Sequence, residues 1–267
     1  MADRYLAHCV VEGWSVRHAG NGPGLEGALA LMPAATLSLV EFEAAWSVLG
    51  LGTVPFPLAG PGRRMSRAQA LTVLAERGLR IGDQWTACLT VLAWPDRSVD
   101  AIGGAGHQLA ALAASARGVA ALAVLDRGTV VLAPIRAGSL VESVVALLPV
   151  VHAGPGHELT VPVAAVRKFL AGDGPTDLVA LTDAGVSPAD AALLVRLAEE
   201  RLRGGQFGAN LADRRSGGLY RGIPVVSWFD TISGRYLMTN DGVTLTVAPA
   251  DSALIAVRLH EVLDGHR

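Results

Sequence analysis

The sequence predicts an α+β fold, in which strands joined by tight turns alternate with capped helices. Helix starts are marked by Ser followed three residues later by an acid or amide, because each side chain satisfies a free N–H group of the first turn. Strands are marked by apolar and Thr-rich runs on either side of Gly-containing turns at 126–128 and 240–242. A pattern of strand, Ala-Pro and helix occurs twice, which predicts two related halves.

Capping signals of this kind occur at four places in the chain, and each predicts a helix. They are Ser38/Glu41, Ser66/Gln69, Ser139/Glu142 and Ser187/Asp190. The first helix is expected to end at Gly50, and the second, with Leu71 and Leu74 facing the core, at Gly78. Both therefore look like ordinary amphipathic helices.

The helix that follows Pro188 is expected to continue to Gly204. Its apolar positions predict a buried face, and its charged positions, Arg203 among them, predict a solvated one.

The internal repeat joins two strands with the same ending. Thr129 to Pro134 reads Thr-Val-Val-Leu-Ala-Pro and Thr244 to Pro249 reads Thr-Leu-Thr-Val-Ala-Pro. A helical pattern follows each, and a strand with a tight turn precedes each. We therefore expect a domain at 35–267, with a first half at about 35–157 and a second half at about 158–267.

The N-terminal residues 1–34 are Gly-rich and show no sustained periodicity, so we expect a mobile extension there. Charged residues such as Glu12 and Arg17 interrupt the place where the apolar core of a signal peptide would lie. Cys9 and Cys88 lack paired spacing and are interpreted as reduced thiols. These features together predict a cytoplasmic protein.

Composition argues against two classes of partner. The formal net charge is −2 and the arginines are scattered singly, so no electrostatic footprint for nucleic acid is predicted. Hydrophobic residues make up 51% of the chain, yet no uncharged apolar run reaches the roughly 20 residues that a membrane span requires.

No reactive constellation stands out in the sequence. A Gly-x-Ser-x-Gly elbow and a Walker loop are both absent from it. His152 and His157 lie in a Gly/Pro-rich loop without metal-ligand spacing. We therefore expect no catalytic residue, no cofactor and no metal, and a protein that is not an enzyme.

The alternative is a small α/β nucleotide-binding protein or enzyme. A strand-like run that starts at Ser98 meets the Gly103–Gly106 turn, a helical pattern follows, and Asp126 lies about 20 residues further on. Leu109, however, occupies the third glycine position, and Asp126 belongs to a predicted hairpin. Saturable nucleotide binding that is lost in Gly106→Val would favour this alternative.

Asp230, Thr231, Arg235 and Tyr236 form the polar cluster that most resembles an active site. Asp and Thr before an Ile-Ser-Gly turn commonly bond to backbone N–H groups, and the glycine relieves positive φ. We interpret the cluster as turn chemistry.

The two hairpin turns of the last third predict which side chains share a face. A two-residue turn at Asp241-Gly242 places Met238 opposite Leu245, and a three-residue turn at 232–234 places Trp228 opposite Met238. The core face would then be Val226, Trp228, Tyr236, Met238, Leu245 and Val247.

The opposite face of these strands is predicted to bind a partner. Phe229 and Leu237 would lie at its centre as apolar anchors within a polar rim. The rim residues are Thr231, Arg235, Thr239, Thr244 and Thr246. An equally weighted alternative is that a helix from the other half covers this face, or that it is a half-solvated sheet.

The order of motifs in the last third resembles the EspG family, the cytosolic proteins associated with ESX (type VII) secretion. The motifs are Gly-Gly-Gln-Phe-Gly-Ala (204–209), Val-Ser-Trp-Phe-Asp-Thr (226–231), Gly-Arg-Tyr-Leu (234–237) and Val-Ala-Pro (247–249). Leu-Gly-Leu-Gly (49–52), Pro-Phe-Pro (55–57) and Arg-Gly-Leu (77–79) are similar to the opening pattern of the family.

The resemblance implies a central antiparallel sheet flanked by helices, two pseudo-symmetric halves and a C-terminal helix. It also implies a non-enzymatic chaperone and targeting adaptor. Such a protein would bind the hydrophobic tip of the PPE subunit of PE–PPE substrates, keep them soluble and direct them to their secretion system. The shared motifs look structural, so no residue is carried over as a partner contact, and the oligomeric state is left open.

Overall fold

The computed structural model describes residues 34–60, 65–104, 109–171, 178–212 and 218–265. The predicted N-terminal extension therefore lies, except for its last residue, outside the described residues.

The described chain is built on one antiparallel sheet of 11 strands, in the order β1-β5-β4-β3-β2-β7-β9-β10-β11-β6, with β8 paired to β7. The strands are β1 Ala35–Ser38, β2 Arg97–Gly104, β3 Leu109–Ala116, β4 Val119–Asp126, β5 Thr129–Pro134, β6 Leu159–Pro162, β7 Arg201–Ala212, β8 Leu219–Arg221, β9 Val225–Thr231, β10 Gly234–Asn240 and β11 Thr244–Pro249. The helices are α3 Leu39–Val48, α4 Arg67–Glu76, α5 Asp83–Ala93, α6 Leu140–Val145, α7 Val163–Ala171, α8 Val179–Thr182, α9 Pro188–Glu199 and α10 Ser252–Asp264.

The element order repeats along the chain. A strand, three helices, four sheet strands and a helix run from β1 to α6, and the same order runs from β6 to α10, with short β8 added. In the sheet, β2 and β7 meet at the centre, and each later strand of one half has its counterpart at the same distance on the other side. This arrangement agrees with the pseudo-symmetry that the internal repeat predicts.

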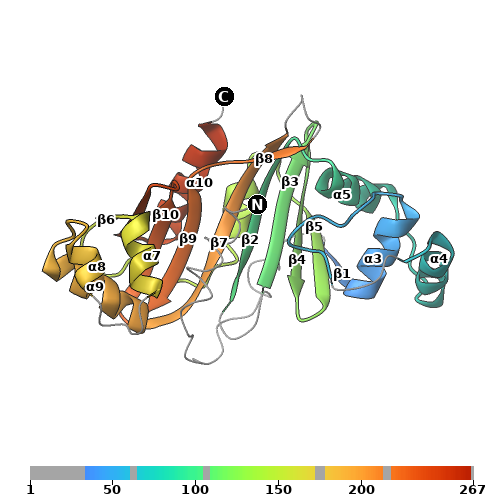
Figure 1. Cartoon of the computed structure of the whole chain (residues 1–267). Coiled ribbons are helices and arrows are strands. Elements are labelled where there is room, and N and C mark those ends of the chain that lie inside the picture. Colours follow the sequence, from blue (N-terminus) through green and yellow to red (C-terminus); the bar gives the residue numbers. More distant parts are fainter. Residues whose placement is uncertain (1–33, 61–64, 105–108, 172–177, 213–217, 266–267) are drawn as a thin grey trace.

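Helices cover the two faces of the sheet differently. On one face, α6 and α10 pack on a core that includes Val99, Phe207, Trp228 and Leu237. On the opposite face, α3 and α5 pack over β3–β5 at one end of the sheet, and α7–α9 pack at the other end. Figure 1 shows the central strands β2 and β7 between these two groups of helices. We call the first face the α6/α10 face.

Three of the four predicted helix caps are present. The reciprocal capping boxes of Ser38/Glu41 and Ser66/Gln69 are complete. Ser187 Oγ accepts a hydrogen bond from the N–H of Asp190. The prediction at Ser139 was wrong, because its hydroxyl donates to the carbonyl of Arg136 at 2.9 Å instead of capping α6.

Three further expectations need correction. Leu71 is 51% exposed, and Ala70 takes its place in the small core between α3 and α4. Helix α9 ends at Glu199, five residues before Gly204, so Arg203 lies in strand β7 rather than on a helix surface. From Arg201 onward the chain is strand β7, which pairs with β9 and β2, and this pairing takes the place of a longer helix.

The segment expected to be helical after the Gly103–Gly106 turn is strand β3, although it is rich in alanine. Alanine favours helices, but this segment pairs along its whole length with β2 and β4 and buries Ala111, Ala113 and Ala114 completely. Tertiary packing outweighs local propensity here.

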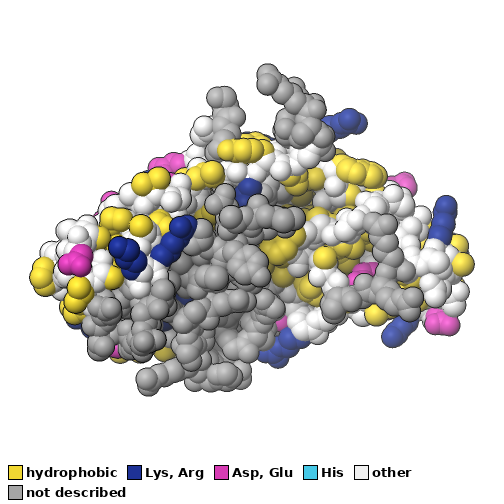
Figure 2. Space-filling model, viewed as in Figure 1, with side chains coloured by type: hydrophobic (Ala, Val, Ile, Leu, Met, Phe, Trp, Pro, Cys, Tyr) yellow, Lys and Arg dark blue, Asp and Glu magenta, His cyan; other side chains and the backbone are white. Residues whose placement is uncertain are grey.

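Within the described ranges, no helix combines the length and the apolar character needed to cross a bilayer. Figure 2 shows apolar and charged side chains interspersed over both helix groups, without a field of one charge.

Candidate functional site

The register of the β9–β10 hairpin differs by one residue from the prediction. Thr231 pairs with Gly234 across the two-residue turn Ile232-Ser233, so Trp228 lies opposite Leu237. A one-residue slip moves every side chain of a strand to the other face. In the next hairpin Met238 pairs with Val247, a shift of two residues from the prediction that preserves the faces.

This register separates the two predicted anchors of the partner surface. Leu237 lies on the α6/α10 face and is 3% exposed, whereas Phe229 lies on the opposite face and is 4% exposed. Phe229 stacks on Tyr236 with 5.4 Å between ring centroids. The prediction of one exposed face around these two residues was therefore wrong, because helices cover both sides of the hairpin.

The predicted rim residues are also divided. Thr231 and Arg235 are buried, and Thr239, Thr244 and Thr246 are half-buried. Thr246 Oγ1 lies 3.2 Å from Thr160 Oγ1 of the neighbouring strand β6. Thr244 and Thr246 lie in β11 beside the edge strand β6, and Thr239 pairs with Thr246, so these threonines do not frame an apolar centre.

Asp230 belongs to a buried ion-pair cluster and not to a turn. Its two oxygens accept from Arg235 Nε at 2.7 Å, Arg235 Nη2 at 3.1 Å and Arg203 Nε at 2.7 Å. We call Arg203, Asp230 and Arg235 the arginine corner. Thr231 does have the predicted turn role, because its Oγ1 accepts from the N–H of Ser233 at 3.1 Å.

Arg235 connects distant parts of the chain. Its side chain is fully buried and donates to Ser252 Oγ of α10 at 3.0 Å and to the carbonyl of Pro149 at 2.8 Å. The guanidinium carbon also lies 4.9 Å from the ring centroid of Trp228. These contacts fix strands β7, β9 and β10, helix α10 and the segment before β6 to one another, which is a structural role.

Glycines of the two central strands allow β2 and β7 to approach closely. Gly103 pairs with Gly205, and a Cβ at Gly103 would lie 2.8 Å from the Cα of Gly205. A Cβ at Gly205 would meet the carbonyl oxygen of Ile102 at 2.5 Å and Trp228 Nε1 at 2.8 Å. The glycine motif at 204–205 therefore serves the junction of the two halves.

The pairing of β2 argues against the alternative of a nucleotide-binding site at the Gly103–Gly106 turn. Strand β2 runs antiparallel to both β3 and β7, whereas a dinucleotide site needs a parallel strand that leads into a helix. Asp126 pairs with Thr129 in the predicted β4–β5 hairpin. Gly106 itself lies outside the described residues.

A second buried carboxylate lies at the centre of the sheet. Asp100 is 3% exposed, and its Oδ2 accepts from Asn210 Nδ2 at 2.8 Å, with Arg221 Nη1 at 3.5 Å. Within the described chain, its Oδ1 has no hydrogen-bond partner. Burial, only partly offset by Arg221 and Asn210, raises the pKa of Asp100 above its usual range. The sequence signal was an acid inside an apolar strand.

A small apolar cavity of about 30 Å³ lies between α7–α9 and the sheet. Its lining residues are Val161, Val166, Leu181, Leu194, Leu197, Phe229, Met238, Leu245 and Val247. The cavity has little more room than one water molecule needs, and its walls offer no polar partner. It is a packing defect rather than a ligand site.

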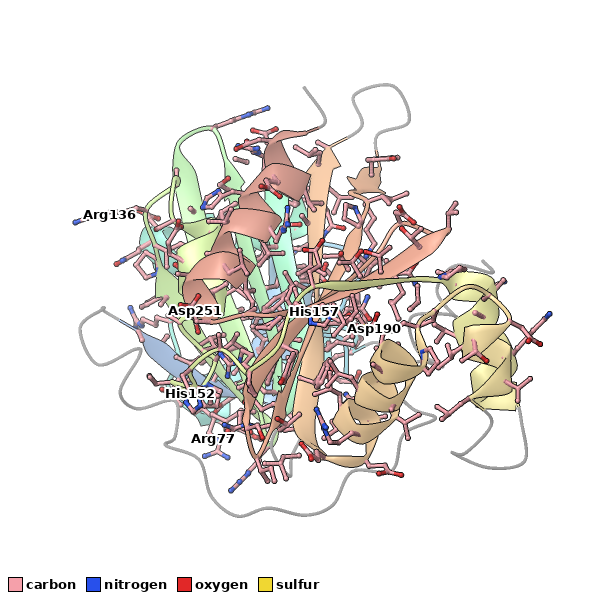
Figure 3. The ribbon with its side chains drawn as sticks, turned by 90° about the vertical axis from the view of Figure 1, so that its left-hand side faces the viewer. Arg77, Arg136, His152, His157, Asp190 and Asp251 are labelled. Atoms are coloured by element: carbon pink, nitrogen blue, oxygen red, sulfur yellow. The ribbon has the colours of Figure 1, made fainter. Side chains whose placement is uncertain are left out.

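The described residues contain no group of three or more side chains arranged to hold a metal ion. His157 Nε2 instead lies 3.1 Å from Asp190 Oδ1, at the start of α9 (Figure 3). Cys88 is a buried free thiol, and burial raises its pKa, which disfavours the reactive thiolate. The contact of His157 with Asp190 joins the loop before β6 to helix α9, and Cys88 packs in the core.

The fold and these clusters define an α+β protein in which two pseudo-symmetric halves share one antiparallel sheet. The EspG family model matches residues 38–261, and the chain belongs to this family. No curated protein sequence matches the chain.

Among solved structures, the chain is similar to the Mycobacterium tuberculosis type VII secretion system chaperone EspG5, in the structure of its complex with a PE25–PPE41 dimer. The TM-score is 0.68 at 17% sequence identity, and the match covers 86% of this chain and 96% of that one. At this identity the likeness establishes the shared fold. The family and the fold that the motif order predicted are both confirmed.

Proposed function

We propose that the protein is a cytoplasmic chaperone and targeting adaptor of type VII secretion. It binds the hydrophobic tip of a PPE-type subunit, keeps the PE–PPE-type substrate soluble and directs it to its secretion system. The observation that carries this proposal is membership of the EspG family over residues 38–261. The shared fold with EspG5, a chaperone solved in complex with a PE25–PPE41 dimer, supports it.

The physical basis of such a function is the masking of apolar surface. An exposed apolar patch of several hundred Å² drives association with other chains. A stable protein partner that covers the patch removes this surface from water and leaves a polar exterior. Selectivity then follows from shape and from polar contacts at the edge of the patch.

A non-enzymatic role agrees with the geometry. The family and the chaperone fold point to such a role. In the described part of the chain, the buried Asp230 pairs with Arg203 and Arg235, and the cavity under α7–α9 is apolar. Chaperone function needs binding and release, not a reactive side chain.

The proposal is tested by a pull-down with the tagged full chain from the cytosol of its native cell, analysed by mass spectrometry. We expect recovery of a PPE-type protein together with a PE-type protein. Leu237 was predicted as an anchor of the partner surface, but Leu237→Arg is unsuitable as a negative control. Leu237 is in the core, and an arginine there would unfold the protein. An unrelated tagged protein of similar size is the control, and repeated absence of PPE-type proteins would contradict the proposal.

A further inference from the structure

Arg201 is a buried cation for which the described residues supply no counter-charge. It is 7% exposed, and none of the described residues accepts a hydrogen bond from its Nε. Burial lowers the pKa of the guanidinium, with no opposing contribution from a carboxylate. Buried charges in proteins are normally paired, because an unpaired one loses its hydration without compensation. Among the residues that the structure describes, Arg201 therefore has no ion-pair partner.

The acids closest in sequence or in strand pairing do not supply this counter-charge. Both oxygens of Asp230 accept hydrogen bonds from Arg203 and Arg235. Glu200 immediately precedes Arg201, but its charge does not offset the burial that lowers the pKa of Arg201. Arg203 and Arg235 thus share the one carboxylate of the arginine corner, and none of its oxygens bonds to Arg201.

A break in the strand register aims Arg201 away from this cluster. The pairing of β7 with β9 shifts between Arg201 and Arg203, so the two side chains point to opposite faces. Arg203 reaches Asp230 on the α6/α10 face. The Nη2 atom of Arg201 lies on the other face, 2.6 Å from where a Cβ of Gly204 would be. A bulge that redirects one side chain is a feature common at binding sites.

The surroundings of Arg201 suit a protein partner. Nε is the atom of Arg201 that is both buried and without a hydrogen-bond partner among the described residues. The two Nη atoms do not belong to this buried, unpaired group. Thr231 pairs with Arg201, and the next residue, Ile232, is 74% exposed at the turn. Arginine is one of the residue types enriched in interface hot spots, and Ile232 adds exposed apolar surface at the neighbouring turn.

We propose that Arg201 is a carboxylate-recognition site, which pairs with an acidic side chain of the polypeptide that the protein binds. The inference rests on the proposed chaperone function and names a polar contact of its partner surface. A carboxylate fits better than a phosphate, because one planar guanidinium supplies one charge and two parallel donors. A partner carboxylate would supply the missing counter-charge, and Ile232 would contact apolar surface beside it.

The first test uses the isolated full chain and Arg201→Met, which keeps the length of the side chain and removes its charge. Since the unpaired charge destabilises the free protein, we expect Tm to rise by about 2–4 °C. Arg196→Gln, at an exposed position of α9, is the matched control and should leave Tm unchanged. A fall in Tm for Arg201→Met would assign Arg201 a structural role and overturn the proposal.

The second test measures affinity for the PPE-type protein recovered by the pull-down. We expect Arg201→Gln to weaken binding at least about tenfold, Arg201→Lys to weaken it less, and Arg196→Gln to bind as wild type does. Unchanged affinity in Arg201→Gln would overturn the proposal even if Tm rises.

If wild type recovers no PPE-type protein, the chaperone proposal fails. Carboxylate recognition by Arg201 is then tested separately, with sodium acetate as the carboxylate. At matched ionic strength, acetate should raise the Tm of wild type above its value in chloride and leave the Tm of Arg201→Met unchanged. The absence of this difference would overturn carboxylate recognition.

Discussion

The two halves of the sheet differ at the residue pairs beside their equivalent hairpin turns. In the first half, Ser115 pairs with Ala120 next to the β3–β4 turn. In the second half, Asp230 pairs with Arg235 at the same place beside the β9–β10 turn, and both are buried. The architecture therefore does not require an ion pair at this position. This buried ion pair is a property of the second half, where Arg201 also lies.

The repeated strands β5 and β11 differ in how tightly the core beside them is packed. Leu132 of β5 and Val247 of β11 occupy the same place in the two Thr-to-Pro repeats and pair with the edge strands β1 and β6. Leu132 is enclosed in the core under α3 and α5, whereas Val247 borders the apolar cavity under α7–α9. The smaller side chain of the second half coincides with the packing defect.

The largest loss of stability is expected from removal of the buried carboxylate of Asp230. Asp230→Ala leaves Arg235 buried without its counter-charge and should lower the free energy of unfolding by about 3–5 kcal/mol. Asp230→Ser combined with Arg235→Ala gives the second half the residues of the first. We expect this double variant to recover at least about 1 kcal/mol relative to Asp230→Ala, as coupled pairs do. Urea unfolding measures the stability of both variants. A double variant whose loss of stability equals the sum of the losses from the two single changes would contradict the account.

The next effect concerns the junction of the halves. Gly205→Ala places a methyl group against the backbone of Ile102 and should destabilise the protein by about 1–3 kcal/mol through overpacking. Gly138→Ala, at an exposed loop position with open space around it, is the matched control. Equal unfolding midpoints for the two variants would show that β2 and β7 can move apart freely.

Exchange of the two repeat residues should have smaller and opposite effects. Leu132→Val opens a gap in the first half and should cost about 0.5–1.5 kcal/mol. Val247→Leu extends into the cavity and should stabilise the second half by up to about 0.8 kcal/mol, the value of one buried methylene. Thermal unfolding of both variants checks the signs. Destabilisation by Val247→Leu would mean that the cavity cannot accept the added group.

The smallest effect is expected at the contact between α6 and α10. His260 Nε2 lies 2.8 Å from Glu142 Oε1. Burial is the largest single effect and raises the pKa of Glu142, but the hydrogen bond with His260, a backbone hydrogen bond and the charge of His260 together outweigh it and lower that pKa below its usual value. The contribution to stability is therefore present above the unfolded-state pKa of Glu142 and is lost as the pH falls through its folded-state pKa.

Because both side chains of this pair are half-exposed, His260→Ala should cost no more than about 1 kcal/mol near pH 6. The difference from wild type should vanish in acid, which urea unfolding at several pH values measures. A difference that persists below the pKa of Glu142 would assign the effect to packing.

Features set by neighbouring residues could be predicted from the sequence. The capping boxes at Ser38 and Ser66 depend on residues three apart, and the two strand repeats predict the order β5, α6 and β11, α10. The prediction failed for β3, because alanine-rich sequence favours a helix until pairing with two strands is taken into account.

The candidate site depended on features that local sequence does not determine. The Ile-Ser-Gly stretch allows a two- or three-residue turn, and the difference reverses the faces of β9. Asp230 before a glycine-containing turn looks like turn chemistry until Arg203 and Arg235 are seen on the flanking strands. The bulge that redirects Arg201 results from the pairing of β7 with β9, which the sequence around Arg201 does not reveal.

The measurement that tests the account most directly is the mass of a complex formed by co-expression. The full chain would be produced with the PE–PPE-type pair recovered by the pull-down, and the purified material measured by native mass spectrometry. The account predicts one copy of the chain bound to one heterodimer, with the PPE-type subunit soluble only when the chain is present. A chain that purifies alone, beside a pair that is equally soluble without it, would contradict the chaperone function.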